Sequence, residues 1–440
     1  MSILPLQFIQ NMKKQLPEKE WEAFFAVYNQ KSYKGVRLNP LKGGRDAIKP
    51  FLPFLGEQIA WEQNGFYTDE EKVGGHPLHF AGAFYSQEPS AMSAAPLLQV
   101  QPGEKVLDLC SAPGGKGTQA ACVMQGQGII VLNEPVYTRA KILLSNVERM
   151  GIKNAVVTSH LPEELSPLFP QYFDKILVDA PCSGEGMFRK NSEEALSEWS
   201  EENVVLCAKR QKHILEHATK MLKAGGRLVY STCTFAESED EGQVRDYLQN
   251  YPQMRLIKQE KLYPHKVKGE GHFVAVFEKT ANENESEKVS GKQLPLAKLQ
   301  ISKNSELVYR AFEKQCFTKE QFKNLHEANG NLYGIPENVF AWKGLNALRV
   351  GVHLGEVKNG RFEPSQALAL SAKADECKNT VKLTLDDART DKYLRGEVIE
   401  DNGENGWCIV CVENYTLGFG KRVQGVVKNH LPKAVRKRGE

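Results

Sequence analysis

Apolar runs of strand length alternate with helical periodicity between residues 104 and 279. In chain order the runs are EKVLDLC, GIIVLNE, NAVVTS, FDKILVDA, GGRLVYSTC, MRLIKQ and HFVAVFEK. Continuous apolar runs that are separated by helices are typical of a parallel sheet covered on both faces. The pattern therefore predicts a doubly wound α/β domain of seven strands.

Two of the intervening helices are well marked. After the second strand, apolar residues recur at spacings of four and three between Pro135 and Gly151, as in a helix with a proline start and a glycine stop. Between the fourth and fifth strands, apolar positions from Val204 to Leu222 predict a longer amphipathic helix.

The segments on either side of this domain have other patterns. The pattern predicts a helix in PEKEWEAFFAVYNQ and a turn-rich segment in YKGVRLNPLKGG. The segment KTANENESEKVSGKQ has the polar composition of a linker. GWCIVCVENYTLGFGKRVQGVVKNH alternates and turns like a β-rich end domain. We expect an N-terminal RNA-binding module at 1–75, the α/β domain at 76–279, a linker at 280–304 and an RNA-binding C-terminal region at 305–440.

Composition changes this picture little. Apolar residues make up 41% and charged residues 25% of the 440 positions, values that exclude disordered, collagen-like and coiled-coil classes. Nine scattered cysteines favour a reducing compartment over a disulfide framework. No run approaches the roughly 18 apolar residues of a membrane span, and the N-terminus lacks the order of a signal peptide. A cytoplasmic protein without a membrane partner is expected.

Positive charge is concentrated at the C-terminus. The net charge is only +3, but the last 20 residues hold seven Lys or Arg against one acid, Glu440. Together with Phe419 and His430, these basic residues predict contacts with RNA phosphates. The alternative is a solvated surface that aids solubility.

The loop after the first strand has the composition of a nucleotide-binding turn. VLDLCSAPGGKGTQAA leads from a strand that ends at Cys110 through two glycines into a helix, whose N-terminus offers free N–H groups. The spacing matches neither a Walker loop nor G-x-G-x-x-G, which favours a ligand with adenosine and no pyrophosphate. Glu134 follows about 20 residues later, where an acid accepts hydrogen bonds from ribose hydroxyls. S-adenosylmethionine fits this pattern; the alternative is a glycine turn with an incidental glutamate.

Two cysteines, Cys182 in DAPCSGEGMF and Cys233 in VYSTCTF, each follow a predicted strand. Ligands of a doubly wound sheet lie at the carboxyl ends of its strands, so both thiols face one crevice if these strands are neighbours. Carbon 5 of a pyrimidine becomes nucleophilic only when a thiolate adds at carbon 6. A thiol beside a methyl donor therefore favours carbon over an exocyclic nitrogen as the methyl acceptor.

Other cysteines predict no chemistry. Cys122 and Cys207 lie on apolar helix faces, where cysteine is a small hydrophobic residue. Cys408 and Cys411 have the spacing of half a metal site, but a second pair is missing and a strand would point them to opposite faces. No metal is expected.

The motifs CSAPGGKGTQ, VLNEP, DAPCSGEGMF and YSTCTF, in this order, closely resemble those of the Nop/Sun family of RNA cytosine-5 methyltransferases. The resemblance covers about residues 80–279 and implies a class I, Rossmann-like methyltransferase fold with S-adenosylmethionine as donor. VRLNPLK at 36–42 and the segment 349–370 resemble a bacterial branch that methylates small-subunit rRNA. For that branch a C-terminal PUA-like domain and 16S rRNA or the small ribosomal subunit as partner are implied.

The resemblance also implies roles for single residues. Cys233 would be the nucleophile, Cys182 would assist proton removal and β-elimination, and Asp179 would hydrogen-bond cytosine near nitrogen 3. The implied cofactor-binding residues are Cys110, Ser111, Ala112, Pro113, Gly114, Gly115, Lys116, Glu134, Arg139 and Asp179. The chain departs from the family after the third strand, where TSHLPEEL lacks the acid that contacts adenine in many members. Ser159 and His160 offer no evident replacement.

Two alternatives stay open. In the first alternative, the enzyme carries out the same reaction on tRNA. In the second, the chain is a ribosome-assembly factor that binds RNA without methylating it. The presence of Cys233, Cys182 and the glycine loop favours an enzyme, because a binding protein has no use for two thiols in a crevice.

Overall fold

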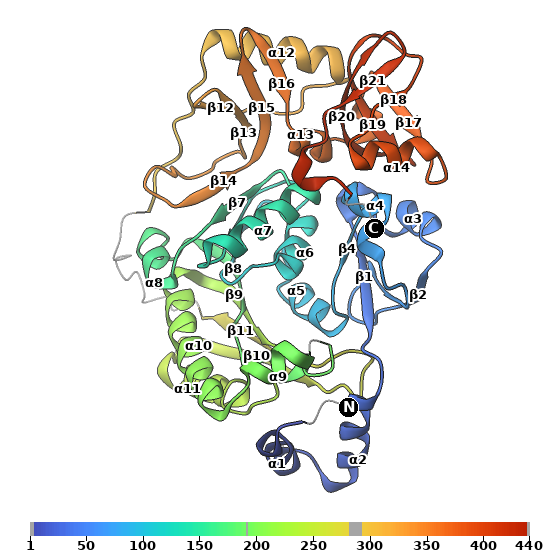
Figure 1. The fold of residues 1–440 in the computed structure, drawn as a ribbon. Helices are drawn as coiled ribbons and strands as arrows, with labels where there is room; N and C mark the ends of the chain where they lie inside the picture. Colours follow the sequence, from blue (N-terminus) through green and yellow to red (C-terminus); the bar gives the residue numbers. More distant parts are fainter. Residues whose placement is uncertain (1–3, 191, 281–292, 438–440) are drawn as a thin grey trace.

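A large mixed sheet forms the centre of the molecule (Figure 1). The computed structural model describes residues 4–190, 192–280 and 293–437, and in these residues the sheet has eight strands in the order β10-β11-β9-β8-β5-β6-β7-β14. Most of the predicted linker, residues 281–292, lies outside the described residues. The strands are β5 (Lys105–Asp108), β6 (Ile129–Asn133), β7 (Ala155–Thr158), β8 (Phe173–Asp179), β9 (Leu222–Thr232), β10 (Met254–Leu262), β11 (His272–Lys279) and β14 (Ala347–Val350).

The seven predicted strands are all present. β7, β6, β5, β8 and β9 are parallel neighbours, while β11 and β10 follow antiparallel to β9. β14 was not predicted in this sheet: it comes from the C-terminal region and pairs antiparallel with β7. The C-terminal region therefore extends the central sheet and is fixed to it by backbone hydrogen bonds.

Helices cover both faces of the sheet, which confirms the doubly wound class. They are α5 (Ala94–Leu97), α6 (Gly115–Val123), α7 (Tyr137–Arg149), α8 (Pro162–Leu165), α10 (Glu201–Met221) and α11 (Glu241–Asn250). Helix α9 (Ser192–Glu198) instead packs against the cluster that contains Phe8 and Phe24. Leu143 of α7 packs in one buried cluster with Leu177, and Leu215 of α10 packs in another with Ile176 on the opposite face. Each such buried side chain stabilises the fold by about 1.5–3 kcal/mol. The two predicted helices correspond to α7 and α10.

The N-terminal segment forms two units rather than one separate module. Its elements are α1 (Leu6–Gln15), α2 (Glu18–Ala26), β1 (Lys34–Leu38), α3 (Gly44–Ile48), β2 (Leu55–Gln58), β3 (Gly65–Thr68), α4 (Pro77–Phe80) and β4 (Phe84–Ser86). Among the described residues, the strands form a four-stranded sheet in the order β2-β3-β1-β4. The sheet extends past the predicted boundary at Gly75, because β4 pairs with β1.

The turn-rich interpretation of YKGVRLNPLKGG is wrong for its first half. Residues 34–38 form β1, which is paired on both sides and buries Val36 and Leu38. Gly35 is needed inside this strand, since a Cβ there would lie 2.7 Å from the carbonyl oxygen of Gln87. Glycine here reflects close backbone packing rather than a turn.

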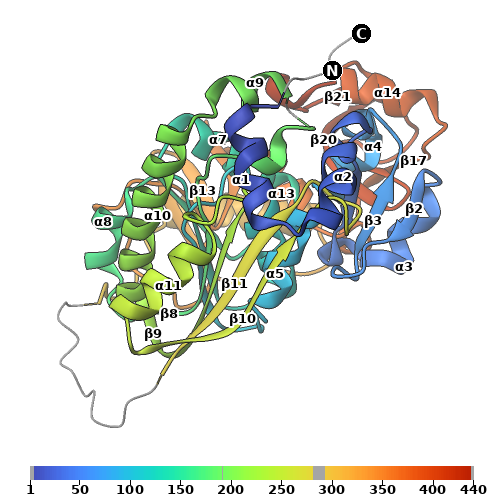
Figure 2. The ribbon, with the colours of Figure 1, turned by 90° about the horizontal axis from the view of Figure 1, so that it is seen from below.

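Helices α1 and α2 pack against the loops that follow β8 and β9 (Figure 2). Phe8 of α1 lies edge-on to Phe188 with ring centroids 5.0 Å apart, and Phe24 of α2 lies edge-on to Phe235 at 5.7 Å. Such pairs contribute about 0.5–1.5 kcal/mol each beyond their buried area. The start of the chain therefore stabilises the two segments that carry the cysteine motifs.

The C-terminal region consists of two small β-units. The first contains α12 (Lys303–Cys316), β12 (Leu325–Ala328), β13 (Asn331–Gly334), β15 (Val352–Lys358), β16 (Arg361–Pro364) and α13 (Gln366–Ser371). The second, the end domain, contains β17 (Thr380–Leu383), α14 (Ala388–Arg395), β18 (Ile399–Glu400), β19 (Gly406–Val412), β20 (Tyr415–Val423) and β21 (Val426–Asn429). The predicted β-rich end of the chain is confirmed.

The end domain shares a buried cluster with the N-terminal sheet (Figure 1). Val36 and Leu38 of β1 belong to the same cluster as Val381, Val410 and Val427. Cys408 lies in this cluster and Cys411 in a different one, which confirms that their side chains leave β19 on opposite faces. None of the helices described is long and apolar enough to cross a membrane.

Candidate active site

Cys182 and Cys233 lie side by side at the carboxyl edge of the central sheet. β8 and β9 are parallel neighbours, with Asp179 paired to Ser231, so the residues just beyond both strands meet. The two sulfur atoms are 3.3 Å apart, and the backbone N–H of Cys233 also donates to Cys182 Sγ at 3.3 Å. The two strands are neighbours, as the expectation requires, and the two thiols meet at this edge of the sheet.

A buried glutamate holds the Cys182 loop. Glu239 Oε2 accepts from the backbone N–H of Ser183 at 3.0 Å and from Gln211 Nε2 at 2.8 Å, and Gln211 Nε2 also donates to Pro181 O. Burial raises the pKa of Glu239 to about 7, against which its hydrogen bonds act. Helix α10, through Gln211, therefore fixes the backbone on both sides of Cys182.

Asp179 is held between two elements of the crevice. Lys116 Nζ donates to Asp179 Oδ2 at 2.8 Å, and Ser231 Oγ donates to Asp179 Oδ1 at 2.9 Å. Burial lowers the pKa of Lys116, but Asp179 outweighs it and the pKa is raised, with a smaller contribution from Cys233. Lys116 is thus an ammonium ion that joins the glycine loop to the cysteine crevice.

The glycine loop runs from Cys110 into α6, as predicted. Gly114 precedes the helix with φ +111°, a left-handed conformation that favours glycine. A Cβ on Gly117 would lie 2.5 Å from Ser111 Oγ and 2.6 Å from Asp108 Oδ2. Glycine at this position lets α6 pack directly on the end of β5 and places its free N–H groups at the crevice.

Glu134 and Arg139 lie beside this loop. Glu134 is buried directly after β6, and its Oε1 accepts from the backbone N–H of Val136 at 3.0 Å. Arg139 Nη1 lies 3.6 Å from Glu134 Oε2, and Arg139 Nη2 donates to Ala112 O at 3.1 Å. Glu134 is therefore oriented toward the loop, while Arg139 is half exposed and bridges the two.

The predicted cofactor residues thus gather around the carboxyl ends of β5, β6 and β8. Those that are buried are Ser111, Ala112, Gly114, Lys116 and Glu134; Cys110, Gly115 and Asp179 are partly buried, and Pro113 and Arg139 are exposed.

Arg37 of β1 is a positioning residue that the sequence did not indicate. It is almost fully buried, and its Nη2 donates to Gly115 O at 3.0 Å and to Thr118 Oγ1 at 2.9 Å. Its Nε donates to Gln87 Oε1 at 3.0 Å. The N-terminal sheet therefore supports the first turn of α6 from behind.

The two thiols differ in their surroundings. The hydrogen bond with Cys233, together with burial, raises the pKa of Cys182 well above the ordinary range of cysteine. Cys182 therefore keeps its proton at neutral pH. The Cys233 sulfur, in contrast, lies near the Lys116 ammonium group.

Asp108 and His272 are further buried groups that the sequence analysis missed. Burial raises the pKa of Asp108, at the end of β5, to about 7. His272 lies one residue beyond the pair Phe273–Thr232 and therefore across from Cys233, and neither ring nitrogen has a partner within the described ranges. Burial and Lys116 lower the pKa of His272 well below its usual value, so it is neutral. Asp108 and His272 each belong to an apolar run that predicts a strand, and the run does not indicate a role for either residue.

The loop after β7 contacts the C-terminal region instead of presenting an acid. The backbone N–H of Ser159 donates to Asn346 O at 3.0 Å, and that of Asn346 donates to His160 Nε2 at 2.9 Å. The adenine-contacting acid that the family motif places here has no counterpart at Ser159 or His160. Asn346 directly precedes β14, so this loop is shaped by the added strand.

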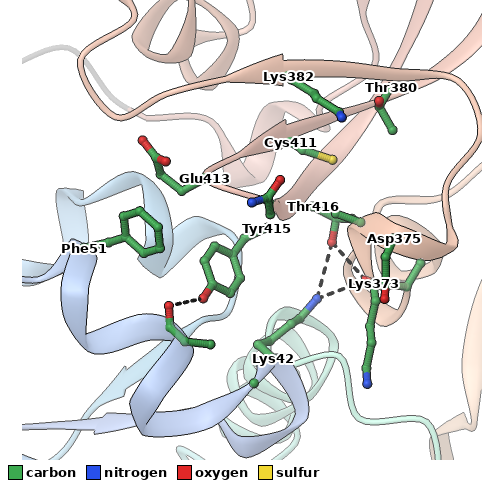
Figure 3. Close-up of a pocket in the computed structure, with 15 residues that line it drawn as sticks. Lys42, Phe51, Lys373, Asp375, Thr380, Lys382, Cys411, Glu413, Tyr415 and Thr416 are labelled. Atoms are coloured by element: carbon green, nitrogen blue, oxygen red, sulfur yellow. Dashed lines mark hydrogen bonds between the residues drawn. The ribbon is translucent and has the colours of Figure 1, made fainter.

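A pocket of about 560 Å³ lies between the N-terminal sheet and the end domain (Figure 3). Lys42 reaches across the junction, and its Nζ donates to Leu370 O, Ala372 O and Thr416 Oγ1. Tyr415 OH donates to Ala47 O at 2.9 Å. Burial lowers the pKa of Lys42 to about 8. Lys42 and Tyr415 therefore fix the end domain to the N-terminal sheet.

Two of the residues expected to contact phosphate are buried. Phe419 lies in the core between α12 and β20, and Arg422 is enclosed, where it pairs with Asp401 and donates to Glu404 O. The prediction is wrong for these two because Phe419 packs against Phe312 of α12, and the Arg422 guanidinium group is hydrogen-bonded to Asn379, Asp401 and Glu404. Lys428, in β21, and His430, directly after it, remain exposed.

Comparison with known proteins identifies the family. Residues 95–284 match the family described as 16S rRNA methyltransferase RsmB/F, and 4–89 match the N-terminal domain of 16S rRNA methyltransferase RsmF. Residues 311–371 match the RsmF first C-terminal domain and 380–437 the RsmF PUA domain. The ribosomal RNA small subunit methyltransferase F of Vibrio vulnificus is 33% identical over 98% of this chain and 97% of its own length. The chain belongs to the ribosomal RNA small subunit methyltransferase F family.

Further relatives of the same name agree. That of Shewanella piezotolerans is 31% identical, over 97% of this chain and 96% of its own. The family consists of S-adenosylmethionine-dependent RNA methyltransferases, so the predicted enzyme class, the class I methyltransferase fold and the C-terminal PUA domain are confirmed.

Solved structures share the central fold. A methyltransferase homologue from Pyrococcus horikoshii superimposes with a TM-score of 0.55 at 25% identity, covering 63% of this chain and 100% of that one. NSun6 from the same organism, solved with SFG, superimposes with a TM-score of 0.57 at 20% identity, covering 64% and 100%. The likeness leaves more than a third of this chain uncovered.

Proposed function

We propose that this chain transfers a methyl group from S-adenosylmethionine to carbon 5 of a cytidine in 16S rRNA, through a covalent bond to Cys233. The observation that carries the proposal is the contact between the sulfurs of Cys182 and Cys233, 3.3 Å apart beside the glycine loop. Methylation of an exocyclic nitrogen has no need of a thiol, whereas methylation at carbon 5 requires one.

The residues around the glycine loop fit the methyl donor. Glu134 offers a buried carboxylate to the two ribose hydroxyls, and the first N–H groups of α6 face the loop that Gly114 opens. Arg139 and Lys116 flank this position, and Arg37 holds the helix start. When bound, S-adenosylmethionine supplies an electrophilic methyl group to the crevice.

Cys233 begins the reaction. Its thiolate adds to carbon 6 of the cytosine, and the electron pair displaced from the ring double bond makes carbon 5 nucleophilic toward the methyl group. The Asp179 carboxyl group would accept a hydrogen bond from the 4-amino group next to nitrogen 3, and the Lys116 ammonium group beside it would stabilise the negative charge that develops on the ring. Ser231 fixes the orientation of the Asp179 carboxyl group.

Cys182 acts at the end. A water molecule takes the proton from carbon 5, and the electron pair of that C–H bond restores the ring double bond and expels the Cys233 sulfur from carbon 6 as a thiolate. Cys182, which keeps its own proton, renews its hydrogen bond to the departing sulfur from 3.3 Å away. We assign Cys182 to assistance of this elimination and Cys233 to attack.

The RNA target follows from the relatives and from the end domain. The full-length relatives are named for small-subunit ribosomal RNA, and exposed lysines such as Lys382 and Lys428 of the PUA domain suit phosphate contacts. The target base leaves its stack to reach the crevice, as a flipped or single-stranded nucleotide. We place the reaction in the cytoplasm, where reduced cysteines persist.

Incubation with labelled S-adenosylmethionine and separated RNAs tests the proposal. Label is expected in 16S rRNA or small subunits, as 5-methylcytidine after nuclease digestion. Label in tRNA alone would support the alternative in which tRNA is the substrate. The absence of methyl transfer to either RNA would support the alternative of an RNA-binding assembly factor. A Cys233→Ala variant is the negative control.

A further inference from the structure

Three side chains of types that bind metals lie close together on α10, away from Cys182 and Cys233. His213, Glu216 and His217 are spaced three and four residues apart, which places them on one face of a helix. One ligand atom of each lies within 4.8 Å of the others, and the two imidazole rings have centroids 4.6 Å apart. This spacing allows all three to reach a single ion.

Residues of the neighbouring segment orient both imidazoles. α8 and α10 lie side by side in both views (Figures 1 and 2). Ser166, just beyond α8, makes a 2.7 Å hydrogen bond to His217 Nδ1, which leaves Nε2 available. Glu163 Oε2 lies 3.0 Å from His213 Nε2. Metal-binding histidines usually have such a second partner, which fixes the ring and its tautomer.

We propose that His213, Glu216 and His217 bind one Zn²⁺ ion, with Glu163 and Ser166 as orienting partners and water in the fourth position. Two imidazoles and one carboxylate are a set typical of Zn²⁺, whereas Mg²⁺ and Ca²⁺ prefer oxygen ligands. All three protein ligands come from α10, and the α8 segment contributes only the orienting partners Glu163 and Ser166. Helix α10 also carries Gln211, which supports the Cys182 loop. The role of the ion would therefore be to stabilise the helix that holds this loop.

The test is a Zn²⁺ titration of the full-length protein after treatment with a chelator. Because Cys182 and Cys233 are themselves candidate zinc ligands, the Cys182→Ser/Cys233→Ser background is used throughout. We expect one equivalent of Zn²⁺ to bind and Mg²⁺ not to compete. His213→Asn and His217→Asn should each weaken binding at least tenfold and Ser166→Ala about tenfold, while Lys209→Ala, on the exposed face of α10, leaves it unchanged.

Co²⁺ substitution provides a second readout. The protein should give the visible absorption of four-coordinate Co²⁺, and that band should vanish in His213→Asn, whose half-exposed side chain can be changed without loss of folding. Equal Zn²⁺ affinity in the parent and the histidine variants, or the same Co²⁺ spectrum in both, would overturn the proposal. The result does not depend on methyl transfer, so it is distinct from a failure of the proposed function.

Discussion

The sulfur atoms of Cys182 and Cys233 lie 3.3 Å apart, although 50 residues separate the two cysteines along the chain. They meet because each follows directly on the carboxyl end of one of two parallel neighbours, β8 and β9. At this distance the two sulfur atoms share one hydrogen bond, in which one donates and the other accepts. Two thiols in one crevice therefore take different roles in the reaction.

Removal of the Cys182 thiol should stall the reaction after attack. In Cys182→Ser we expect a covalent RNA–protein complex to accumulate on a denaturing gel and multiple turnover to fall about 100-fold, the order expected for loss of acid–base assistance. The change should leave the attack itself intact, because Cys233 remains. Cys207→Ser, a buried helix position, is the matched control and should show no complex. Free release of methylated RNA from Cys182→Ser would rule out this role.

The Lys116 ammonium group should matter for rate more than for RNA binding. Lys116→Met removes the donor to Asp179 at 2.8 Å, and we expect methyl transfer to fall about 100-fold, as when one charge-stabilising donor is lost. It also leaves Asp179 unpaired and partly buried, so the melting temperature should drop.

The double variant Lys116→Met/Asp179→Asn separates these effects. It should regain thermal stability, because no unpaired charge remains, and stay inactive. Lys141→Met, an exposed position on α7, controls for loss of a lysine. Restored activity in the double variant would contradict the role given to the pair.

Asp108 should make stability depend on pH. Its pKa in the folded chain is raised to about 7 by burial, whereas an unfolded aspartate titrates near 4. Between these values the folded state binds one more proton, so stability falls as pH rises through that window. A shift of roughly three units corresponds to about 4 kcal/mol.

Chemical denaturation in the absence of methyl donor measures this effect. The free energy of unfolding of the parent, relative to that of Asp108→Asn, should fall between pH 4 and pH 7 and then level off. A constant difference across this range would show that Asp108 is not the titrating group.

Exposed lysines of the PUA domain should set the salt dependence of RNA affinity. Lys382→Ala/Lys428→Ala should reduce the slope of log affinity against log salt by about two, one for each lost phosphate contact. Point variants are preferable to deletion of the domain, because deletion would expose Val36 and Leu38 of the shared cluster. Lys209→Ala/Lys212→Ala on α10 is the control. An unchanged slope would remove these lysines from the RNA interface.

The sequence predicted the central sheet and the meeting of its cysteines because both depend on local patterns. Apolar runs give the strands, and parallel order brings Cys182 and Cys233 to the same edge. The local pattern of the sequence did not predict contacts between segments that are distant along the chain. Arg37 binds Gly115 across 78 positions, and β14 joins the central sheet from the C-terminal region. The residue types around Arg37 do not indicate that Gly115 is its partner, and those around β14 do not indicate that it pairs with β7.

Charged residues and glycines have different roles in the structure from those that their residue types suggest, because burial decides the outcome. Arg422 looks like a surface cation in the sequence, but it is enclosed with Asp401 in the middle of a sheet. Gly35 suggested a turn, whereas it permits close packing inside β1. The expectation of no metal rested on cysteine spacing, which carries no information about His213, Glu216 and His217 on α10.

The direct test of the central claim is the site of covalent attachment to RNA. Cytidine with fluorine at carbon 5 has no proton to lose there, so elimination is blocked and the adduct persists. With S-adenosylmethionine and such an RNA, mass spectrometry of the digested complex should place the nucleotide on Cys233, and Cys233→Ser should form no complex. A nucleotide found on Cys182, or a complex that forms equally in Cys233→Ser, would contradict the account.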